Sequence, residues 1–185
     1  MIRFLAVFIS TFLFISCATV EEAIEEEPEP VDTEEVRFPG WFDDTVSARA
    51  GQGQAIGYAK AIGSEAGWAA ENARSQALSN LRFRVDDLLE EARREVAESN
   101  DSAGSRDFII SLRNSIAELD IASIASVQTD TMEEEQSILA IAKAEVDAEA
   151  ILEALGEEIR EYRNLWQQML DTEALQDIRV SEPTP

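Results

Sequence analysis

The chain has 185 residues, with 15 Lys and Arg against 38 Asp and Glu, a formal net charge of −23 and no histidine. Nucleic-acid binding needs cationic side chains to neutralise phosphates, so this composition excludes it, and anionic lipid headgroups are equally poor partners. The absence of histidine removes the commonest general base and the commonest transition-metal ligand, so we expect no enzyme, no cofactor and no metal site.

The first residues predict a secretory signal peptide. A short basic start, Met1–Arg3, precedes a run over 4–15 that is apolar except for Ser10 and Thr11. The run is shorter than the ~20 residues that a membrane-spanning helix needs. We therefore interpret residues 1–16 as a signal peptide and not as a membrane anchor.

The residues that follow predict lipidation. Phe14–Cys17 resembles a lipobox, although Phe stands where Leu is usual, and Cys17 is the only cysteine in the chain. A lone cysteine after such a run is more economically a lipid acceptor than half of a disulfide. Acyl chains on Cys17 would then hold the protein on the membrane. The alternative is ordinary cleavage after Ala18, which would release a secreted soluble protein.

Residues 17–37 predict an acidic tether behind the lipidated cysteine. Nine acidic residues and no basic ones lie between Glu21 and Glu35, together with Pro28 and Pro30. Such a segment buries too little apolar surface to offset the entropy of ordering it, so we expect disorder.

A folded domain is predicted over 38–178. Its start, Phe38–Phe42, combines aromatic residues with Pro-Gly and predicts a segment pinned onto the core. Three glycines follow within residues 51–57, in a spacing that does not match a phosphate-binding loop, so we interpret them as turn and close-packing residues. Residues 54–62 alternate, which predicts a strand with a small-residue face and a face containing Tyr58.

The next segment predicts one long helix from Glu65 to about Ser99, with Ser64 as the N-cap. Its length corresponds to roughly 50 Å. The alanine-rich first half suits close packing on the alanine face of the strand, and the larger second half would project past the sheet. The predicted buried stripe consists of Ala66, Ala70, Ala73, Ala77, Leu81, Val85, Leu88, Ala92 and Val96.

The remaining elements complete an α+β pattern. Residues 100–104 break the helix, and Ser105 caps a second one. Residues 121–131 and 137–146 predict two strands around an acidic turn at 132–136, although the second is alanine-rich and helix is an alternative. A last helix runs from about Asp147 to near Leu175, and residues 179–185 form a disordered end. The predicted fold is a single small α+β domain of order β-α-α-β-β-α, with about three strands packed against long helices.

Two sets of residues are candidate sites. Trp41 flanks the tether and is a candidate interface anchor. The distal stripe of the long helix extends beyond what a short strand covers, so we predict self-association through Val85, Leu88 and Val96.

A groove between helices and sheet, lined by Tyr58 and Trp68, is the alternative site, for a small ligand or peptide. The two hypotheses differ in class: the first makes the protein an interaction component and the second makes it a binding module.

Several motifs together resemble the Lpp-twenty lipoprotein family. They are the lipobox, the spacer, Pro39-x-Trp41, Gly57–Tyr58–Ala59, the alanine-rich helix and the closing hairpin. Within the folded part the resemblance covers residues 38–146. The resemblance implies an outer-membrane lipoprotein that faces the periplasm, among relatives that include surface antigens and flagellar disk lipoproteins. It implies no catalytic residues. We therefore expect a non-catalytic envelope lipoprotein whose partners are the membrane, through Cys17, and other envelope proteins or further copies of itself.

Overall fold

The computed structural model describes residues 37–134 and 136–179. The chain divides into the units Met1–Val36 and Arg37–Pro185, of which the second contains all the described elements. These elements are β1 (Ala48–Gly51), β2 (Gln54–Gly63), α1 (Ala66–Ala97), η1 (Asp101–Gly104), α2 (Arg106–Glu118), α3 (Ile121–Ile124), β3 (Ser126–Glu134), β4 (Ser137–Asp147), α4 (Ala148–Glu158), η2 (Arg160–Tyr162), α5 (Arg163–Leu170) and α6 (Glu173–Arg179).

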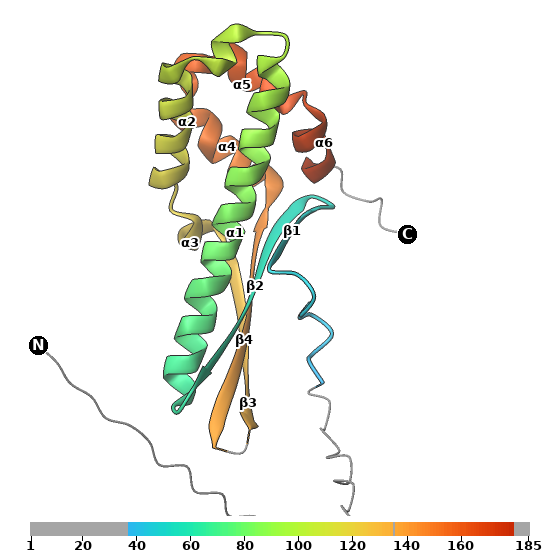
Figure 1. Cartoon of the computed structure of the whole chain (residues 1–185), viewed down its shortest axis with the longest axis vertical. Coiled ribbons are helices and arrows are strands. Elements are labelled where there is room, and N and C mark those ends of the chain that lie inside the picture. Colours follow the sequence, from blue (N-terminus) through green and yellow to red (C-terminus); the bar gives the residue numbers. More distant parts are fainter. Residues whose placement is uncertain (1–36, 135, 180–185) are drawn as a thin grey trace, which may run out of the picture. The chain divides into compact units, whose positions relative to one another are not determined.

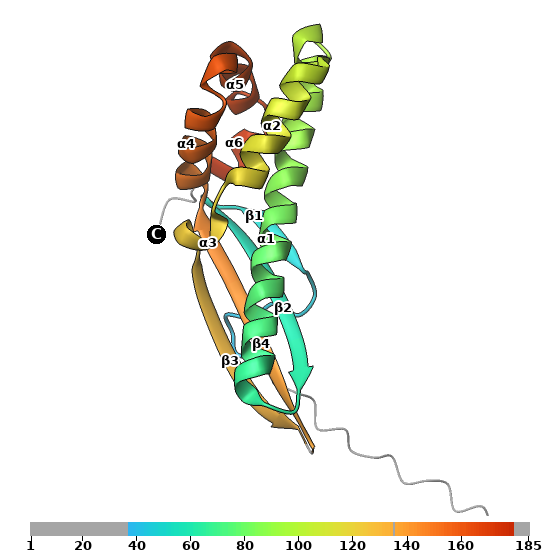
Figure 2. The same cartoon turned by 90° about the vertical axis from the view of Figure 1, so that its left-hand side faces the viewer.

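The four strands form one antiparallel sheet in the order β1-β2-β4-β3. Helix α1 runs along one face of this sheet, and its C-terminal half extends beyond the strands (Figures 1 and 2). Helices α2, α4, α5 and α6 gather around that half. The antiparallel sheet with covering helices confirms the coarse α+β prediction.

Small side chains set the distance between α1 and the sheet. On β2 and β4 the face toward α1 consists mainly of alanine and glycine, with Val146 and Ile138 toward its two ends. The facing positions of α1 begin with Ala69, Ala73 and Ala77. A Cβ atom added at Gly57 would lie 2.2 Å from the carbonyl oxygen of Ala77, so helix and strand touch backbone to backbone. The alternation predicted for residues 54–62 is confirmed, because Tyr58 lies on the opposite face.

The sequence analysis did not predict strand β1, which pairs with β2. Gln52 and Gly53 both have positive φ angles, 56° and 82°, which is the geometry of a tight two-residue hairpin. Strand β1 therefore pairs with the first half of β2. The interpretation of these glycines as turn and close-packing residues is confirmed.

Helix α1 begins at Ala66, and the position before it is Glu65, whose side chain makes no capping bond. The prediction of Ser64 as the N-cap is therefore wrong. The predicted cap of the second helix is confirmed, since the Phe108 N–H donates to Oγ of Ser105 at 3.4 Å.

The predicted strand over 121–131 is wrong in its first half. Residues Ile121–Ile124 form the short helix α3, and the strand covers Ser126–Glu134. Ile121 is buried against the α1 core, so packing overrides the local alternation. The acidic segment after residue 131 belongs largely to β3, and the turn is displaced toward residue 136.

The predicted last helix is also wrong as a single element. It is divided into α4, η2, α5 and α6, with breaks near Ile159 and Thr172. A straight helix over residues 148–179 would extend more than 40 Å at 1.5 Å per residue and leave the core. Folding back lets Leu155, Trp166 and Ile178 all reach the distal half of α1.

Candidate functional site

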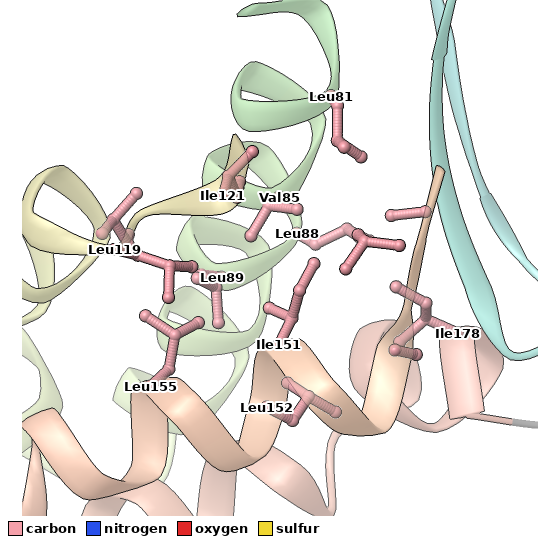
Figure 3. Packing of buried hydrophobic residues seen from close by; sticks show 14 of the residues in the cluster. Leu81, Val85, Leu88, Leu89, Leu119, Ile121, Ile151, Leu152, Leu155 and Ile178 are labelled. Atoms are coloured by element: carbon pink, nitrogen blue, oxygen red, sulfur yellow. The ribbon is translucent and has the colours of Figure 1, made fainter. Parts of the chain in front are cut away.

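The distal stripe of α1 is intramolecular core. Val85, Leu88 and Val96 are only 3%, 5% and 4% exposed. Figure 3 shows Val85 and Leu88 pointing toward Ile151 of α4, with Ile178 of α6 close by. The predicted self-association surface is therefore not available, because the divided C-terminal helices cover it.

Tyr58 and Trp68 do not share a groove. Tyr58 is 3% exposed on the sheet face away from α1, where its ring meets Phe42 edge to face at 5.7 Å. Trp68 lies on α1, is 59% exposed, and rests its ring edge on Gly63. The predicted groove is wrong because the side chain of residue 58 alternates to the other side of the sheet.

Trp41 belongs to a small aromatic cluster on the sheet face that α1 leaves open. It is half-buried, and its ring meets that of Phe42 edge to face at 5.9 Å. Phe38 and Phe42 pack with it over Ile56 and Ile141. The prediction that the segment 38–42 is pinned onto the core is confirmed.

The outer edge of β2 is only partly paired. Strand β1 covers the edge as far as Gly57, and the Tyr58 N–H then donates to the carbonyl oxygen of Ser47 at 2.8 Å. The carbonyl oxygen of Tyr58 accepts from Nδ2 of Asn80 at 2.7 Å. Because the direction of these groups alternates along the strand, the next N–H and C=O groups that point outward belong to Lys60 and Ile62. Among the described residues these groups have no hydrogen-bond partner on that edge.

Exposed apolar side chains border this open edge. Ile62 is 62% exposed on the strand itself, and Trp68 lies against its end at Gly63. Val46, which is 40% exposed, lines a hollow of about 300 Å³ beside Tyr58, Lys60 and Asn80. Three of the large apolar side chains exposed in the described residues therefore lie along one strand edge, with Ile62 on the sheet face away from α1 and Trp68 on the α1 side. We call Ala59–Gly63, with Val46 and Trp68, the open β2 edge.

The opposite edge of the sheet, β3, is protected. It carries Asp130, Glu133 and Glu134. The outward N–H of Thr131 already donates to Oδ1 of Asp130 at 2.8 Å. Charged side chains are a common means of blocking edge-to-edge pairing, so the two edges differ in their capacity to accept a further strand.

A cavity of about 730 Å³ lies away from the sheet, among α4, η2, α5 and α6. Trp166 lines it, and a Cβ atom at Gly156 would lie 2.8 Å from the indole nitrogen, so the glycine makes room for the ring. Helix α4 contributes three glutamates, whereas η2, α5 and α6 contribute three arginines. The charged lining residues are Glu149, Glu153, Glu157, Arg160, Arg163 and Arg179. No ion pair within 4.0 Å joins any two of these six.

The perturbed titratable groups have structural explanations. Two hydrogen bonds from Arg93 lower the pKa of Glu90 to about 2, helped by Arg94. Hydrogen bonds from Thr45 lower the pKa of Asp43. In 37–134 and 136–179 no group of three or more His, Cys, Asp or Glu residues is placed to hold a metal ion.

Several predicted features lie outside the described residues. They are the signal peptide 1–16, Cys17, the tether up to Val36 and the end beyond Arg179. Within the described part, no helix combines the length and the apolar character required to cross a bilayer. Neither a protein-family model, nor a curated protein sequence, nor a solved structure matches this chain.

The sequence analysis did not predict the open β2 edge, because without β1 it could not say which part of β2 has a neighbour. The signal was present: a short run, Ala48–Ala50, precedes Gly51–Gln52–Gly53, and such a turn between two extended segments indicates a hairpin. The shortness of β1 then leaves the second half of β2 without a neighbour.

Proposed function

We propose that the protein is a non-catalytic envelope lipoprotein, anchored through acylated Cys17, whose folded domain acts through protein–protein contacts. The observation that carries the proposal is the position of Val46, Ile62 and Trp68 along a strand edge that no described strand pairs beyond Gly57. Exposed apolar groups gathered in one place indicate an interaction site. Unpaired strand edges bind extended segments through main-chain hydrogen bonds.

The anchor follows from the sequence. The lipobox and the lone Cys17 support lipidation, and the resemblance to the Lpp-twenty family supports an outer-membrane location that faces the periplasm. Ala18 follows the cysteine, where Asp often retains a lipoprotein in the inner membrane. A role in a flagellar basal body or at the cell surface accords with that resemblance.

The anchor is tested by labelling cells with a fatty acid and fractionating them. The wild-type chain should carry the label and sediment with membranes, and the Cys17→Ser chain should lose both properties, because it lacks the only acyl acceptor. Label that persists on the Cys17→Ser chain would contradict the lipoprotein proposal.

The interaction role is tested by photo-crosslinking in cells. A photoreactive residue at position 62 or 68 of the full chain should give covalent adducts with protein. The matched control is position 110 on α2, since Ile110 is also exposed, at 45%. Equal adduct yields at all three positions would show that the open β2 edge is not a preferred contact.

A ligand-binding module is the second candidate, and the cavity at Trp166 favours it. Its three glutamates disfavour a purely anionic ligand, and its three arginines disfavour a purely cationic one, so its lining fits a zwitterion such as a short peptide with free ends. The indole N–H resonance of Trp166 should shift when trialanine is added. N-acetylated or amidated trialanine should shift it less, because each lacks one charge. No shift at about 10 mM trialanine, some tenfold above a weak Kd of about 1 mM, would remove this candidate.

A further inference from the structure

The open β2 edge differs in charge from most of this molecule. The whole chain has a formal net charge of −23, yet Ala59–Gly63 contains one lysine and no acidic residue. Two copies of so acidic a protein repel each other, and a contact that keeps carboxylates apart makes the short-range part of this repulsion smallest. The strand residues 59–63 of the β2 edge meet that condition. Asp43 and Asp44 line the hollow beside Lys60, and Asp44 lies 3.7 Å from the Lys60 ammonium group. The β3 edge carries Asp130, Glu133 and Glu134 on the strand itself.

From this contrast, and resting on the interaction role proposed above, we propose that β2 of one molecule pairs antiparallel with β2 of a second copy. The two-fold axis passes through Ala61. The two sheets then join into one continuous sheet through their β2 edges, and each outer β3 edge stays in solvent.

Hydrogen-bonding geometry selects this register. Lys60 and Ile62 are the residues whose N–H and C=O groups point outward and find no partner within 37–134 and 136–179. An axis at Ala61 places Lys60 opposite Ile62 of the second copy, so that the outward groups of both residues are satisfied. An axis at Lys60 would instead oppose two lysines. It would also align Ile62 with Tyr58 of the second copy, whose carbonyl oxygen already accepts from Asn80.

The side chains also favour the register with the axis at Ala61. Ile62, which is 62% exposed, comes to lie beside the aliphatic stem of Lys60 of the second copy. The ammonium group of Lys60 lies over the ring of Phe38 at 4.5 Å and near Asp44 at 3.7 Å, so the charge stays balanced within its own molecule. Pairing therefore removes apolar surface from water without opposing like charges.

The register is tested by disulfide trapping in the full chain on membranes. Residue 61 would face its own copy in a non-hydrogen-bonded pair, with Cα atoms about 4.5 Å apart, within the range that a disulfide spans. Residues 62 of the two copies would lie about 8 Å apart, which is too far. After mild oxidation, Ala61→Cys should yield a dimer that reducing agent dissolves, and Ile62→Cys should yield at least about tenfold less. An equal yield from both variants, or none from Ala61→Cys, would overturn the inference.

A second measurement uses proline, which removes one N–H. Ile62→Pro deletes an outward donor of β2, and Thr131→Pro deletes an outward donor of β3, so both are edge substitutions. Ile62→Pro should weaken dimerisation of the detergent-solubilised chain by about tenfold or more, and Thr131→Pro should leave it unchanged. Equal effects of the two substitutions would contradict the β2 contact.

The two proposals fail in different ways. Photo-crosslinks from position 62 to another protein, without a dimer from Ala61→Cys, would sustain the interaction role and overturn pairing between copies. The absence of crosslinks from positions 62 and 68 would overturn both.

Discussion

Gly57 of β2 and Leu81 of α1 pack backbone against backbone: a Cβ atom at Gly57 would lie 2.5 Å from the Leu81 nitrogen and 2.2 Å from the Ala77 oxygen. Neither atom can give way by changing a rotamer. This contact sets how closely α1 approaches the sheet, and therefore where Asn80 reaches the carbonyl oxygen of Tyr58.

We expect Gly57→Ala to lower the free energy of unfolding by about 3 kcal/mol, because the helix must move away from the strand. Urea unfolding of the purified domain measures the change. The matched control is Gly67→Ala on α1, where nothing lies within 4 Å of the new Cβ atom. That variant should gain up to about 1 kcal/mol from helix propensity. Two variants of equal stability would show that the contact at Gly57 is looser than described.

Leu88→Ala should lower the free energy of unfolding by about 3 kcal/mol, since Leu88 is 5% exposed inside the core that α4 and α6 complete. The sedimentation coefficient of the folded protein should not change, because the residue contacts only its own chain. Phe83→Ala, at a position 64% exposed on the same helix, should cost less than about 0.5 kcal/mol. A change in association with little loss of stability would restore the distal stripe as an interface.

The stability conferred by Glu90 should depend on pH in a defined direction. Its pKa falls from 4.5 to about 2 on folding, chiefly through hydrogen bonds from Arg93. A lowered pKa stabilises the fold above the unfolded value, and the contribution disappears as pH falls from about 4.5 through about 2. At pH 7 Glu90→Gln should cost about 1 kcal/mol, a value kept small because the carboxylate is 28% exposed.

The measurement is urea unfolding of both proteins across that pH range. The gap in unfolding free energy between wild type and Glu90→Gln should close toward pH 2. Glu91→Gln, an exposed neighbour on the same helix, is the control and should show no such convergence. A gap that is constant with pH would mean that the substitution acts through packing.

Helix capping offers a comparison between two residues. Asp147 Oδ1 accepts from the Ala150 N–H at 3.1 Å at the start of α4, so Asp147→Ala should cost about 1 kcal/mol. Ser64 makes no capping bond to α1, so Ser64→Ala should be neutral. Thermal unfolding of both variants measures the difference. A larger loss for Ser64→Ala would show that Ser64 caps α1 and that the helix begins one residue earlier than described.

The sequence analysis predicted correctly the helices and strands that have a clear hydrophobic periodicity. The alternation over 54–62 and 137–146 and the long stripe of α1 each depend on which face is buried, and a single element contains that information. The sequence also predicted the tight packing at the glycines and the cap at Ser105.

The features that the sequence analysis did not predict depend on contacts with residues distant in the chain. Ile121 begins a helical turn because the core of α1 accepts its side chain, although its neighbours alternate as in a strand. The candidate site belongs to this class. The open β2 edge begins where β1 ends, and its limit at Tyr58 depends on a hydrogen bond from Asn80 of α1.

By itself the sequence therefore determined the acidic composition, the periodic elements and the face that each presents. Only the tertiary structure decided that the distal stripe of α1 is covered and that the second half of β2 is not. The physical reason is that burial and edge pairing are properties of neighbours in space. The divided C-terminal helices return to Leu88, and no described element returns to Ile62.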